Sequence, residues 1–130
     1  MDAFEYFGTD TRFLPRLVAA LRPGGALAMS TPALRQDPYT AAMPDHVRAV
    51  FGAEAAAWHS PAWWQRHWEL TGLVDDIDAR WQEGGRDDWL MWERIRRTRL
   101  NQTDRSPVIA MLEADTDEQL GFALVSARKR

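Results

Sequence analysis

Two histidines, His59 and His67, lie in a segment that is crowded with tryptophan. Imidazole is the side chain whose ordinary pKa lies nearest neutrality, so it is the usual general base in enzymes. Burial among indole rings without a partner lowers the pKa of a histidine, because it disfavours the charged form. Both histidines are therefore candidate catalytic bases. The alternative for each is a role in packing or in a structural hydrogen bond.

The tryptophans themselves form a second candidate feature, because all seven lie between residues 58 and 92. On a helix that starts at the Ser-Pro pair before them, Trp64, His67 and Trp68 share one face. Trp63 lies one turn before the histidine. Indole rings supply large apolar walls, each with one hydrogen-bond donor. We predict that Trp63, Trp64 and Trp68 line a substrate pocket; a large interface and ordinary core packing are the alternatives.

The elements that position these residues begin with a helix from Asp10 or Thr11 to about Leu21, with an apolar face at spacings of three and four. A Pro-Gly-Gly turn ends it. The apolar run 26–30 follows as a strand, which Pro32 closes. Uninterrupted apolar strands are typical of sheets that are covered on both faces, as parallel sheets are.

The rest of the chain alternates between helices and strands. Asp45 starts a short helix, and the Ser-Pro pairs at Ser60 and Ser106 start two longer ones. Asp87 or Asp88 opens another helix, and strands are expected over 73–81 and 120–127. The sequence thus predicts an α/β fold with about three strands. Helices over so small a sheet leave one edge unpaired, which suggests a missing partner segment.

The composition excludes several classes of protein. The chain has 130 residues, a formal net charge of −3 and no cysteine. One domain is expected, with no disulfide, no thiolate metal site and no nucleic-acid partner. No apolar run reaches the roughly 20 residues of a membrane helix, and no secretory signal is visible, so we expect a cytoplasmic protein without a membrane partner. The histidines lack the zinc-helix spacing of four, so no metal site is predicted.

Five segments, taken in order, resemble the C-terminal half of class I S-adenosylmethionine-dependent methyltransferases, which have a seven-stranded Rossmann-like fold. The most specific is Leu21-Arg-Pro-Gly-Gly-Ala-Leu, which is similar to the LxPGGxL signature before the fifth strand. The others are Asp2 to Phe7, similar to the loop after the fourth strand; Leu14 to Leu21, similar to the next helix; Trp58 to Leu73, similar to the helix and turn before the sixth strand; and Gly121 to Arg128, similar to a last strand that runs antiparallel.

The resemblance implies S-adenosylmethionine as cofactor, with its methionine end beside Asp2, Ala3, Phe4, Glu5 and Tyr6. It also makes Glu5 a third candidate catalytic group. The family's glycine-rich loop after the first strand is absent, because the chain contains no G-x-G. Residues 1–130 are therefore expected to be a single partial domain without the N-terminal cofactor-binding half. Two explanations stay open, namely a piece of a longer protein and a complementary subunit that carries the first half.

Two functions follow from these observations. The first is methyl transfer from S-adenosylmethionine to a small molecule, with segment 58–68 lining the acceptor pocket. The second is a non-catalytic α/β module that forms a homodimer or binds another chain through its exposed edge and its tryptophans. The missing glycine-rich loop favours the second for the isolated chain, and Asp2 to Phe7 favours the first for its origin.

Overall fold

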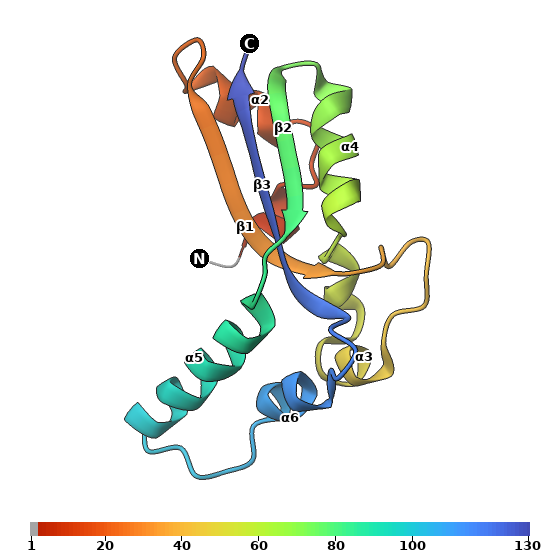
Figure 1. Cartoon of the computed structure of the whole chain (residues 1–130), viewed down its shortest axis with the longest axis vertical. Coiled ribbons are helices and arrows are strands. Elements are labelled where there is room, and N and C mark those ends of the chain that lie inside the picture. The colour runs from red at the N-terminus through yellow and green to blue at the C-terminus, as the bar shows by residue number, and fades with distance from the viewer. Residues whose placement is uncertain (1–2) are drawn as a thin grey trace.

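The computed structural model describes residues 3–130, which form a three-stranded sheet at one end of the molecule and a group of helices at the other (Figure 1). The sheet order is β1-β3-β2, and β3 runs antiparallel to both neighbours. This confirms the α/β class and the antiparallel last strand. The elements are α1 (Phe4–Phe7), α2 (Phe13–Ala19), β1 (Ala26–Leu34), α3 (Asp45–Phe51), the 3₁₀ helix η1 (Gly52–Ala57), α4 (Pro61–Thr71), β2 (Val74–Trp81), α5 (Gly85–Arg99), α6 (Pro107–Ala114) and β3 (Leu120–Lys129).

Strand β1 continues past Pro32 to Leu34, so the prediction that Pro32 closes it is wrong. Gly25 and Arg35, just before and just after β1, both have odd numbers, and the Gly25 carbonyl and the Arg35 N–H both bond to the β3 side. Because bonding direction alternates along an antiparallel ladder, the N–H and C=O groups of the even-numbered residues of β1 face the open edge. Pro32 has an even number, so its missing N–H costs no ladder bond. The expectation of burial on both faces is also wrong for this strand, since Ala26, Ala28 and Ser30 are exposed.

Strand β2 departs from simple alternation at its start. A bulge between Asp75 and Asp78 shifts the register with β3, and Asp76 has φ of 53°. Val74 is consequently buried, although the alternation places it on the face opposite Ile77. The helices before and after β2 begin differently, because only α4 has a side-chain cap. Ser60 accepts the Trp63 N–H at the start of α4, as predicted, while α5 begins earlier than Asp87.

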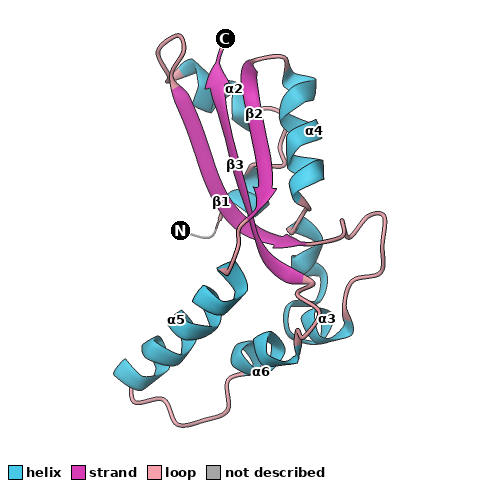
Figure 2. Cartoon of the chain, viewed as in Figure 1, coloured by secondary structure: helices cyan, strands magenta, loops and turns pink. Residues whose placement is uncertain are grey.

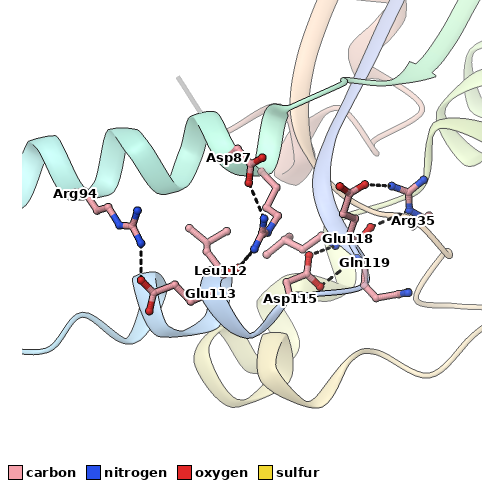
Figure 3. Close-up of polar contacts among 10 residues, drawn as sticks. Arg35, Asp87, Arg94, Leu112, Glu113, Asp115, Glu118 and Gln119 are labelled. Atoms are coloured by element: carbon pink, nitrogen blue, oxygen red, sulfur yellow. Dashed lines mark hydrogen bonds and ion pairs between the residues drawn. The ribbon is translucent and has the colours of Figure 1, made fainter.

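Two hydrophobic cores hold the elements together. The first lies between the sheet and helices α2 and α4, with Trp64 and Trp68 at its centre. The second gathers α3, η1 and α6 around Trp58 and the start of β3. Helices α5 and α6 pack together below the sheet (Figure 2), where Arg86 donates to the Leu112 carbonyl and Arg94 pairs with Glu113 (Figure 3). Within residues 3–130, no helix has the length and apolar character needed to cross a membrane.

Candidate functional site

The end of β1 delivers an aspartate to the junction of the two cores. Asp37 follows the strand by three residues and is buried, with 8% of its surface exposed. Its main-chain carbonyl accepts the N–H groups of Thr40 and Ala41, and its Oδ1 accepts the Tyr39 N–H at 3.0 Å. Such side-chain-to-backbone bonds are typical of an aspartate that starts a turn. The turn fixes the carboxylate and leaves Oδ2 for another donor.

A second connection brings a histidine to this carboxylate. The Trp58 carbonyl accepts the Leu34 N–H at 3.0 Å, which ties the end of η1 to the last residue of β1. His59 comes next in the chain, and Ser60 then caps α4. Trp58 belongs to one core and Trp64 to the other, so His59 is clamped between two packed anchors. The histidine therefore has little freedom to leave its position.

Asp37 and His59 form a buried pair. The distance from His59 Nδ1 to Asp37 Oδ2 is 2.9 Å. The side chain of His59 is 6% exposed and that of Asp37 is 9% exposed. An ionised carboxylate on Nδ1 fixes the neutral tautomer that carries its proton there. The lone pair then lies on Nε2, which has no hydrogen-bond partner among the described residues and is not sealed from solvent. This arrangement can accept a proton from a bound molecule.

The His59 ring belongs to a row of four stacked rings, which are those of Tyr39, His59, Trp63 and His67. The His59 ring lies on Trp63 with centroids 3.6 Å apart and planes 9° apart. Tyr39 stacks on its other side at 5.4 Å, and His67 stacks on the far face of Trp63 at 4.7 Å. Stacked aromatic neighbours hold a ring in one orientation. The imidazole is thus fixed both by its hydrogen bond and by its two faces.

An open groove of about 520 Å³ borders the stack. The 3₁₀ helix η1 forms one wall, where three small side chains leave the space free. The lining residues are Thr9, Tyr39, Ala53, Ala56, Ala57, His59 and Trp63. The structure therefore brings His59 and Trp63 together at one groove, and adds Tyr39, which is 76% exposed.

His67 is bound differently from His59. Its Nε2 lies 3.1 Å from the Gly8 carbonyl, which can only accept, so this nitrogen carries a proton. Burial lowers the pKa of His67 and outweighs the Gly8 carbonyl, which raises it; a positive charge on His59 lowers it further. The neutral ring links α4 to the segment after α1.

In the predicted cofactor segment, Phe4, Glu5 and Tyr6 lie in helix α1. Glu5 is buried, and its Oε2 accepts the Thr31 hydroxyl at 2.9 Å. Phe4 packs against Trp64 at 5.6 Å, while Tyr6 donates its hydroxyl to Glu54 of η1. Ala3 is half-buried before the helix, and Asp2 lies outside the described residues. The Tyr6–Glu54 bond places this segment beside the groove that His59 lines.

Trp64 and Trp68 do not reach the groove. Both are fully buried in the first core, at 0% exposure, and their indole N–H groups have no partner among the described residues. Trp63 lies one position earlier on α4 and lines the groove; it stacks on His59, whereas Trp64 meets the same ring edge-on. The helical spacing predicts which of the three tryptophans share a face of α4, but it does not predict which face the sheet covers.

Sequence reasoning missed Asp37 and Tyr39. Both fall in the proline-rich stretch 31–45, whose turn chemistry hides their partner. The available signal was an aspartate followed by proline just after a strand, a position where a carboxylate reaches backbone donors. Its pairing with His59 spans 22 residues, which no local pattern reports. Residues 3–130 contain no cluster of three or more side chains suited to hold a metal ion.

Comparison with known proteins adds the fold. No protein-family model matches the sequence, and no curated protein is similar to it in sequence. Two solved structures of phosphoethanolamine N-methyltransferase 2 from Haemonchus contortus are similar, each with a TM-score of 0.72 and 14% identity. One is a complex with S-adenosyl-L-methionine, and the other holds phosphomonomethylethanolamine and S-adenosylhomocysteine. The match covers 98% of this chain but only 31% and 32% of those chains, so the chain has part of a methyltransferase fold.

Proposed function

We propose that this chain is the acceptor-side part of an S-adenosylmethionine-dependent methyltransferase that acts on a small molecule. The observation that carries the proposal is the buried Asp37–His59 pair, because His59 lines a groove large enough for a small molecule and its Nε2 has no hydrogen-bond partner among the described residues. The likeness of fold supports the reaction class. His59 serves as the general base, Asp37 orients it, and Trp63 holds its ring.

The α1 segment fits the methionine end of the cofactor. Glu5 is a buried carboxylate held by Thr31, and such a group complements a nearby sulfonium or ammonium charge. Ala3, Phe4 and Tyr6 frame it, and we assign Asp2 to the same site. S-adenosylmethionine held there would supply a methyl group on its sulfonium for transfer to the acceptor. The described residues include no glycine-rich loop for the adenosine end.

The chain's own residues supply position and proton transfer. The groove orients the acceptor against the ring stack, and His59 Nε2 takes its proton while Asp37 stabilises the resulting imidazolium. His67 has its Nε2 committed to Gly8, so it holds the segment that carries α1 in register with α4. Trp64 and Trp68 support this frame from the core.

Two measurements test the proposal. Calorimetric titration with S-adenosylhomocysteine tests cofactor binding, and transfer of a labelled methyl group to candidate acceptors tests the reaction. His59→Gln should lower the transfer rate about 10²–10⁴-fold, the usual contribution of a general base. His46→Gln, at a histidine that does not line the groove, is the matched control and should leave the rate unchanged. Absence of binding at millimolar S-adenosylhomocysteine would refute the proposal for this chain.

The second candidate function is pairing with another chain, and the open edge of β1 favours it. The N–H and C=O groups of Ala26, Ala28 and Ser30 face away from β3 and meet no strand among residues 3–130. A homodimer or a complementary N-terminal half would cover them. Light scattering of the purified chain distinguishes a monomer from a dimer, and Ala28→Pro should abolish a dimer that forms through this edge.

A further inference from the structure

The lining of the groove carries no fixed charge. Apart from His59, its residues are a threonine, a tyrosine, a tryptophan and three alanines. Asp37 lies behind His59, where Tyr39 N–H and His59 Nδ1 take its two oxygens. A ligand in the groove therefore meets the exposed Tyr39 ring, the edges of His59 and Trp63, methyl groups and two hydroxyls.

The charges around the groove disfavour an anionic ligand. Glu54 follows the lining residue Ala53 in η1 and adds a negative charge to the helix that forms one wall. The arginine nearest to Asp37 in sequence, Arg35, is turned away, because its guanidinium binds Glu118 and lies 4.6 Å from the Trp81 ring centroid (Figure 3). A phosphate ester carries nearly two negative charges at neutral pH and is usually bound by arginine or lysine. This groove offers neither.

The base favours an acceptor with an acidic hydroxyl. A phenol has an ordinary pKa of about 10, so an imidazole can take its proton at a modest cost. An aliphatic alcohol is far less acidic. A planar ring also matches the walls, since Tyr39 is largely exposed at the end of the ring stack and three alanines line the groove beside it.

We propose that the acceptor is an uncharged planar molecule with a phenol-like hydroxyl, and that it is not a phosphorylated amine. This inference rests on the proposed function. In the step assigned to this chain, the O–H bond of the acceptor breaks, its proton moves to His59 Nε2, and the electron pair stays on oxygen. The imidazolium formed is stabilised by Asp37, and the acceptor oxygen becomes the nucleophile.

The test uses 4-nitrophenol, which is colourless as the phenol and yellow as the phenolate, with the full chain and no cofactor. At a pH below the pKa of free 4-nitrophenol, saturable binding should raise the phenolate-to-phenol ratio about tenfold, as expected for one charge-assisted hydrogen bond. Phosphoethanolamine at the same concentration should not displace it. Binding without added colour, displacement by phosphoethanolamine, or no binding would each overturn the inference.

Three variants assign the effect to the groove. Asp37→Asn and His59→Gln should return the bound ratio to that of free 4-nitrophenol, and Tyr39→Ala should weaken binding several-fold. His46→Gln is the control and should change nothing. Circular dichroism verifies that each variant folds. If the His59 and Asp37 variants fail to fold, the colour change and the phosphoethanolamine competition on the unmodified chain still decide the inference.

Failure of this inference is distinguishable from failure of the proposed function. If 4-nitrophenol binds and ionises while S-adenosylhomocysteine does not bind, methyl transfer is refuted for this chain and the ligand class stands. If S-adenosylhomocysteine binds and phosphoethanolamine, but not 4-nitrophenol, occupies the groove, the ligand class is refuted and methyl transfer stands.

Discussion

Residues 3–130 contain two histidine–aspartate pairs of the same length, 2.9 Å. In one, His59 Nδ1 meets Asp37, and in the other, His46 Nε2 meets Asp115. Identical side chains at identical distance therefore serve different purposes. What separates the two pairs is the other bonds that each aspartate makes.

Asp115 is a structural group. It follows α6, has no exposed side-chain surface, and accepts the N–H groups of Gln119 at 3.1 Å and Leu120 at 3.0 Å (Figure 3). Both of its oxygens are thus committed to the turn that starts β3. Its histidine, His46, lies on α3 and is 24% exposed, and it does not line the groove of His59. A pair with this pattern stabilises a chain reversal.

The Asp37 side chain accepts fewer backbone hydrogen bonds than the Asp115 side chain does. One oxygen accepts a single backbone N–H, from Tyr39, and the other is left to His59. The histidine is buried between rings but lines the groove, and its second nitrogen has no hydrogen-bond partner among the described residues. The comparison teaches that two pairs with the same distance differ in what remains unbonded, and this difference is why we propose a catalytic role for His59 and none for His46.

The largest expected effect comes from Asp115→Asn. An asparagine offers one carbonyl oxygen, so either the Gln119 or the Leu120 N–H loses its acceptor at a fully buried side chain. The cost of such an orphaned donor is about 2 kcal/mol of unfolding free energy. The melting temperature should fall by roughly 6–10 °C, measured by circular dichroism. An unchanged melting temperature would contradict the structural role of this pair.

The same substitution at the other pair, Asp37→Asn, should cost less than about 1 kcal/mol, because the amide oxygen can still accept the Tyr39 N–H. The amide NH₂ then faces His59 Nδ1, which must become an acceptor, so the proton moves to Nε2. Nitrogen chemical shifts of labelled histidine report this tautomer exchange directly. Loss of stability equal to that of Asp115→Asn would break the distinction between the pairs.

Much of the frame around these pairs could be predicted from the sequence. Ser60 and Ser106 followed by proline start helices α4 and α6, and both serines accept the expected backbone N–H. These signals are local, because the cap and its donor lie three residues apart. The end of β1 was mispredicted because the cost of a proline depends on which edge of the strand its nitrogen faces, and only the neighbouring strand decides that.

The candidate site itself was half predictable. His59 and Trp63 stand out by their residue types in a short segment, and the structure stacks them. Asp37 could not be assigned, since the Leu34–Trp58 backbone bond that brings it to His59 joins segments distant in the sequence. Trp64 resembles Trp63 in type and position, and only tertiary packing places one in the core and the other at the groove.

The smallest expected effect concerns His67, which contrasts with both paired histidines because its partner is a neutral carbonyl. Its pKa is lowered in the folded chain, chiefly by burial, so the unfolded chain binds a proton more readily. Stability is therefore full above about pH 6.5, the ordinary histidine pKa, and is lost progressively as the pH falls toward the lowered value.

His67→Gln should remove this part of the pH dependence. Glutamine can still donate to the Gly8 carbonyl, but it does not titrate, so the fold keeps its link between α4 and the segment after α1. Urea unfolding at pH 7.5 and at pH 5.5 measures the difference in each protein. The variant should lose less stability between the two pH values than the unmodified chain does, and equal losses would mean that the carbonyl bond does not hold a neutral ring.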